Sequence, residues 1–219
     1  MASERSAPLQ LKSLVLVPSV VTLAVTLLRL TGELLGWSPM LFAKAAGGAG
    51  ALVGIVWLVP VFGIYFAWKL AQAGTAAGAG RVVGHALLAL ALAVGSAAAA
   101  ARVLKLAMGG QFLVTFAACT VAAWIAYRGW PALGRALVAY GLAARVPVIV
   151  VMLAAIFGHW GTHYDVPPLG FPEMAPLLKW FYIGFLPQMF LWVPFTVFVG
   201  ALCGGLTLLA TGRRQVVVP

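Results

Sequence analysis

The chain has 219 residues, of which 63% are hydrophobic and 8% are charged, and its mean hydropathy is +1.06. Soluble proteins carry roughly 25% charged residues, so this composition excludes a soluble domain and predicts an all-α polytopic membrane protein. The net charge of +10 does not indicate nucleic acid, because the basic residues lie scattered between apolar runs, as expected of loops that contact lipid headgroups.

Six apolar runs predict a bundle of about six transmembrane helices in a single integral membrane domain, residues 1–219. In chain order the expected spans are 12–35, 50–70, 81–107, 111–128, 131–157 and 179–211, and an outer loop covers 158–178. The first run is long enough to span, so we expect it to be retained as a helix.

Glycine and proline suggest how the runs begin, end and bend. We expect Gly109 and Gly110 to end the third run, which is almost all leucine or small residues and predicts a tightly packed central helix. Pro131 suits the first turn of the fifth helix. The sixth run exceeds the thickness of a bilayer, and Pro187 and Pro194 are its expected kink points.

The distribution of basic residues predicts that both termini are cytoplasmic. With that orientation the inner side holds eight basic residues: Arg5, Lys12, Lys69, Arg81, Arg128, Arg135, Arg213 and Arg214. The outer side holds four: Lys44, Arg102, Lys105 and Lys179. An alanine-rich chain that favours arginine over lysine indicates a bacterial protein, which we expect in the cytoplasmic (inner) membrane.

Four G-x-x-x-G pairs mark places where helices could approach closely, although such pairs also arise by chance in a glycine-rich chain. They are Gly32/Gly36, Gly50/Gly54, Gly80/Gly84 and Gly200/Gly204.

Four polar or charged residues, Arg29, Glu33, Arg145 and Gln188, are expected at membrane depth. A charge there costs about 2.5–3.5 kcal/mol on insertion scales, so each group needs a protein partner or water. Arg29 and Glu33 are spaced i,i+4 and can pair on one helix face. The alternative is a pair that reaches water at the outer interface and merely ends the helix.

Arg145 lies near the middle of the fifth run, two residues before Pro147, and Glu33 is the only acid within the apolar runs. A cluster of Arg29, Glu33 and Arg145 would carry net positive charge and could receive an anion. The alternative is a structural ion pair between the first and fifth helices.

The outer loop gathers His159, His163, Tyr164, Asp165 and Glu173. His159, His163 and Asp165 are candidate metal ligands, but the glycines around them disfavour a helix that would bring both rings to one face, and no fourth ligand is evident. We therefore expect no metal or other cofactor. The loop is rich in proline, which favours a stiff cap or a lid over an outward-facing cavity.

The chain contains none of the common catalytic motifs, such as G-x-S-x-G, H-E-x-x-H, a P-loop or C-x-x-C. We expect a non-enzymatic membrane protein that binds or transports a small polar or anionic solute between the first, fifth and sixth helices. One alternative is a structural or assembly subunit that contacts other membrane subunits or a second copy. Another is a membrane-embedded enzyme that acts on a lipid at the outer interface.

Overall fold

The helices of the structure follow the apolar runs of the sequence. The computed structural model describes residues 10–212, and every regular element within them is helical. Six helices are long and apolar enough to cross a membrane: α1 (Leu11–Leu34); η2 (Ile55–Trp57) with α2 (Leu58–Gln72); α3 (Ala79–Ala98) with η3 (Ala99–Val103); α4 (Met108–Gly129); α5 (Pro131–Gly158); and α6 (Pro176–Lys179) with η4 (Trp180–Phe185), η5 (Gln188–Trp192) and α7 (Val193–Thr211). The predicted all-helical fold, with six helices long and apolar enough to span a membrane, is confirmed within these residues.

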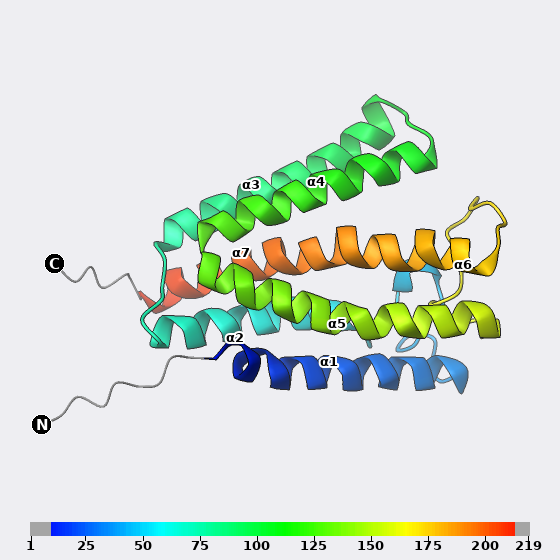
Figure 1. The fold of residues 1–219 in the computed structure, drawn as a ribbon, viewed down its shortest axis with the longest axis horizontal. Helices are drawn as coiled ribbons and strands as arrows, with labels where there is room; N and C mark the ends of the chain where they lie inside the picture. The colour runs from blue at the N-terminus through cyan, green and yellow to red at the C-terminus, as the bar shows by residue number, and fades with distance from the viewer. Residues whose placement is uncertain (1–9, 213–219) are drawn as a thin grey trace, which may run out of the picture.

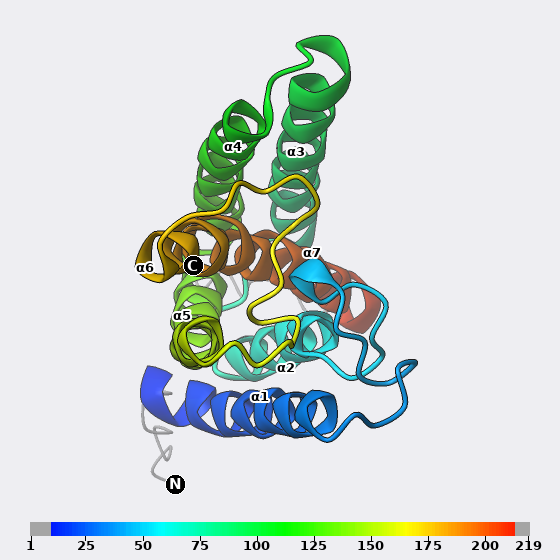
Figure 2. The ribbon, with the colours of Figure 1, turned by 90° about the vertical axis from the view of Figure 1, so that its right-hand side faces the viewer.

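The six helices run roughly side by side, and α1 begins at the same end of the bundle at which α7 ends (Figure 1). At the opposite end, two long connections fold over the helices: residues 35–54, which include the short helix η1 (Ala46–Gly48), and residues 159–175 (Figure 2). Both connections therefore cover the same end of the bundle.

Helix α7 occupies the centre, where it contacts α2, α3, α4 and α5. The sequence predicts this position for α3, and that prediction is wrong: α3 pairs with α4 and diverges from the other helices toward the loop-covered end (Figure 1). The most apolar stretch of the sixth helix is 56% buried, against 22% for α3. Small side chains on α3 therefore serve a close pairing with α4 and not a central position.

Close helix contact is made by a glycine pair that the spacing rule does not identify. A Cβ at Gly63 in α2 would lie 2.8 Å from the Cα of Gly200 in α7, so α2 has no room for a side chain there, and a Cβ at Gly200 would collide with Leu137 of α5. Of the predicted pairs, Gly200/Gly204 lies in this packed region, whereas Gly80 and Gly84 have open space beside them.

Helix α1 packs against α5, and a buried hydrogen bond joins the two helices between Thr22 Oγ1 and Tyr140 Oη, 2.8 Å apart. Tyr140 is fully buried, and its ring packs against Phe62 and Phe66 of α2. This contact fixes the position of α1, whose C-terminal turns carry Arg29 and Glu33.

Three predicted boundaries differ from the structure. Residues 50–54 are not helical, and the second helix begins at Ile55 because Gly50 adopts a positive φ of 80° and Gly54 is extended. The break between α3 and α4 falls at residues 104–107, so Gly109 and Gly110 lie in the first turn of α4 and do not end α3.

The sixth helix begins one turn earlier than predicted, at Pro176, and contains two wide π-helical turns. Pro187 and Pro194 each lie two residues after one of these turns, where the missing proline N–H groups interrupt the α-helical hydrogen bonds. The second turn carries Gln188 and Trp192, and such turns often occur at functional sites.

Candidate functional site

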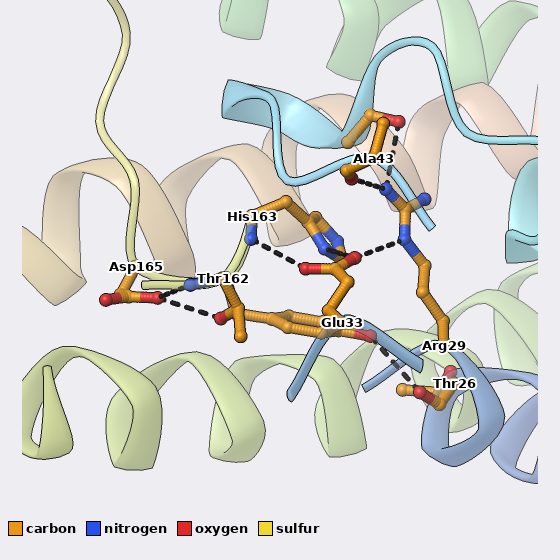
Figure 3. A network of polar contacts seen from close by, with 9 residues as sticks. Thr26, Arg29, Glu33, Ala43, Thr162, His163 and Asp165 are labelled. Carbon is orange, nitrogen blue, oxygen red and sulfur yellow. Dashed lines mark hydrogen bonds and ion pairs between the residues drawn. The ribbon is translucent and has the colours of Figure 1, made fainter. Parts of the chain in front are cut away.

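Glu33 is the centre of a buried polar cluster at the loop-covered end of the bundle (Figure 3). Its side chain is 0% exposed, and Arg29 Nε donates to its Oε1 over 2.8 Å. The backbone N–H of His163 donates to Oε2 over 2.8 Å, and His163 Nδ1 lies 2.5 Å from Oε1. Oε1 is thus held by the preceding turn of α1 and by the distant loop 159–175, and Oε2 is held by that loop.

The contact with Glu33 also assigns the histidine tautomer. An ionised carboxylate only accepts hydrogen bonds, so Nδ1 of His163 carries the proton and Nε2 is free to accept. Burial, reinforced by the charge of Arg29, lowers the pKa of His163 against the opposing effect of Glu33. His163 is therefore neutral near pH 7, and its charge is absent from the cluster.

Arg29 is held on its other side by the connection between α1 and α2. Its Nη2 donates to the carbonyl oxygens of Ala43 at 3.1 Å and Gly48 at 3.2 Å. Gly48 has a φ of 77°, and a Cβ there would lie 3.2 Å from both Arg29 Nη1 and His163 Cδ2. A glycine at this position lets the loop close around the guanidinium.

The loop that carries His163 is held by its own side chains. Asp165 accepts hydrogen bonds from the backbone N–H groups of Gly161 and Thr162, at 2.9 and 2.7 Å, and from Thr162 Oγ1 at 2.8 Å. Tyr164 Oη donates to the carbonyl of Thr26 in α1 over 3.2 Å. Residues 161–165 thus form an ordered cap attached to α1.

Arg145 lies deeper in the bundle and is 4% exposed. Its Cζ lies 4.8 Å from the centre of the Trp192 ring, and its Nη1 donates to Gln188 Oε1 over a long 3.4 Å. Within residues 10–212, its Nε is the only buried side-chain nitrogen or oxygen without a hydrogen-bond partner. A buried cation with this little compensation in the described chain is an unusual feature.

The predicted ion pair between Glu33 and Arg145 does not form, because Arg29 and His163 occupy the carboxylate. The partner that the sequence did not supply for Arg145 is Trp192, which lies four residues after Gln188. Trp192 could have been identified from the sequence because its i,i+4 spacing places it on the same helix face as the predicted residue Gln188, and because an aromatic face attracts a guanidinium.

A cavity of about 250 Å³ connects the two groups. It is bounded by α1, α5, η4 and η5, by Phe112 of α4 and by both loops, and its polar and charged side chains are Thr26, Arg29, Arg145, His163, Tyr164, Tyr182, Gln188 and the indole of Trp192. Apart from glycines, the rest of the lining is apolar. One cavity thus brings together five of the predicted residues: Arg29, Arg145, Gln188, His163 and Tyr164. Glu33 does not line it and lies behind Arg29 and His163.

The other predicted loop residues do not join this cavity. His159 ends α5 in a left-handed conformation with φ of 50° and is exposed, as is Glu173. Asp165 is buried but is engaged by its own loop. In the part of the chain that the structure describes, no three His, Cys, Asp or Glu side chains gather as metal ligands would, so His159, His163 and Asp165 do not form a common site.

No protein-family model, curated protein or solved structure matched this chain in the comparisons. Inference about its function therefore rests on the chemistry of the cavity.

Proposed function

We propose that the chain is a non-enzymatic membrane protein that binds, and by extension transports, a small anionic or polar solute in the cavity between α1, α5 and the sixth helix. The observation that carries this proposal is the buried Nε of Arg145, which has no hydrogen-bond partner among residues 10–212 and belongs to a side chain that lines the cavity. A cation at membrane depth costs about 2.5–3.5 kcal/mol on insertion scales, and neither a carboxylate nor a full set of acceptors in the described chain offsets that cost. A bound anion would do so.

The depth of the two arginines supports a path that begins at the loop-covered end. Arg29 lies five residues before the end of α1, and Arg145 lies thirteen residues before the end of α5. At a rise of 1.5 Å per residue, Arg29 and Arg145 lie about 8 and about 20 Å below the ends of their helices. A solute that enters past residues 159–175 would meet Arg29 first and Arg145 near the middle of the bundle.

The charge distribution supports an orientation for this path. The excess of basic residues at the opposite end favours that end as cytoplasmic, so the cavity would face the outside of a bacterial inner membrane. Residues 159–175 would then act as the outer lid.

A thermal-shift experiment tests the proposal. The protein in lipid nanodiscs is heated with chloride, phosphate, acetate or hexanoate, and its melting temperature is recorded. At about 100 times its Kd, a ligand adds about 2.7 kcal/mol, or about 5–11 °C for a chain of this length. We expect such a shift with at least one anion for the wild type, and none for Arg145→Gln.

Arg135→Gln is the matched control, because it makes the same chemical change on the exposed part of the same helix, away from the cavity. It should keep the full shift. The absence of any shift in the wild type, or an equal shift in Arg145→Gln, would overturn the proposal.

A further inference from the structure

The guanidinium of Arg145 presents one free edge. Gln188 takes Nη1, whereas the Nε–H and the Nη2 group beside it make no hydrogen bond to any residue from 10 to 212. Nε and Nη2 form the edge of a guanidinium that binds a planar carboxylate through two parallel hydrogen bonds. Because Trp192 lies against the guanidinium, this edge is held in a fixed orientation.

The ionisable side chains around the cavity carry a net charge of +1. Arg29 and Glu33 cancel each other, and His163 is neutral as the donor to Glu33, which leaves the charge of Arg145. A single negative charge therefore neutralises the site. A phosphate ester carries −1.5 to −2 near pH 7 and would leave excess negative charge in an apolar surrounding.

The lining next to Arg145 is apolar. Val148 and Met152 follow it on the same face of α5, one and two turns along, and both line the cavity with Leu191 and Val25. Chloride gains nothing from these contacts and acetate gains only through its one methyl group, whereas a longer hydrocarbon group gains roughly fourfold in affinity for each buried methylene. At about 250 Å³ the cavity is smaller than typical drug-sized sites of about 300–1,000 Å³.

We infer that the solute is a small organic monocarboxylate with an apolar body, whose carboxylate pairs with the Nε–Nη2 edge of Arg145 and whose body lies along Val148 and Met152. This inference rests on the proposed function and names its ligand class.

Titration calorimetry with four probes measures separately what the carboxylate and the apolar body of the ligand contribute to binding. Hexanoate is compared with acetate, which has the charge without the body, and with 1-hexanol, which has the body without the charge. Phosphate tests the charge count. Empty nanodiscs measure the partition of each probe into lipid, and that background is subtracted from the titrations of the wild type and of Arg145→Gln. We expect hexanoate to bind at least tenfold more tightly than each of the other three.

A variant of the lining tests the body directly. Val148→Thr keeps the shape of the side chain and replaces one methyl group by a hydroxyl, so it should lower the ratio of hexanoate to acetate affinity severalfold and leave acetate affinity nearly unchanged. An unchanged ratio would count against contact between the body and α5.

The outcomes separate this inference from the proposed function. If phosphate or acetate binds through Arg145 as tightly as hexanoate does, the ligand class is wrong and the anion site stands. If no probe binds, or if every probe binds Arg145→Gln equally, both fail. Palmitate is titrated as a fifth probe, and a preference for palmitate over hexanoate would place the source of the carboxylate in the bilayer and overturn the assignment of a small soluble ligand.

Discussion

Replacing Glu33 with Gln should destabilise the protein strongly. The carboxylate accepts from Arg29 Nε and twice from His163, and both of its oxygens are used. Gln offers one oxygen and one NH₂, so one N–H of the cluster would face another donor, and Arg29 would lose its counter-charge. Removing one partner of a buried ion pair lowers the free energy of unfolding by about 3–5 kcal/mol. For a chain of this length, this corresponds to a fall of about 6–20 °C in melting temperature.

The assay is thermal unfolding in nanodiscs without added anions, near pH 7.5. Glu173→Gln is the matched control, because Glu173 is exposed in the same connection that carries His163, and it should melt with the wild type. The double variant Arg29→Gln/Glu33→Gln should recover part of the loss, since no buried cation then remains unpaired in the cluster. A melting temperature of Glu33→Gln equal to that of Glu173→Gln would refute the buried cluster.

Three further predictions follow from the described contacts. Because burial keeps the pKa of His163 below its usual value of about 6.5, its neutral form stabilises the fold above that pH, and this contribution is lost as the pH falls below it. The melting temperature should therefore fall as the pH is lowered, and His163→Asn should reduce this dependence whereas His85→Asn should keep it. Gly63→Ala forces α2 away from α7 and should lower the melting temperature by several degrees, whereas Gly84→Ala, with open space beside it, should leave it unchanged or raise it. Asp165→Asn should speed amide hydrogen exchange in residues 159–165 and leave exchange in the six helices unchanged.

The number and approximate length of the helices could be predicted because hydrocarbon demands long apolar segments with internal hydrogen bonds, and such segments are visible in composition alone. The ends of the helices could not be fixed as well. Gly109 and Gly110 are ordinary helix breakers in sequence terms, yet they fit the first turn of α4, where no side chain is needed. The central helix was also misplaced, because small residues on α3 serve a pairing with one neighbour.

The site was predicted where its partners are near in sequence. Arg29 and Glu33 share a helix face and do form the expected pair. The third member, His163, lies 130 residues from Glu33, and its approach depends on where the 159–175 loop folds. Depth along the helices instead suggests Arg145 as the third member, because Glu33 is the only acid within the apolar runs that could pair with it. Spacing gives the position of a residue along one helix but not the rotation of that helix toward its neighbours.

The separation of 130 residues between Glu33 and His163 also sets an order of events during synthesis. Ribosomes add about 5–20 residues per second, so α1 is synthesised on the order of ten seconds before the loop that completes its cluster. During this interval Arg29 is the partner already present in the nascent segment, and the i,i+4 spacing makes the pair available as soon as the helix forms. The local ion pair thus gives the Glu33 carboxylate a partner in the growing chain until His163 has been synthesised.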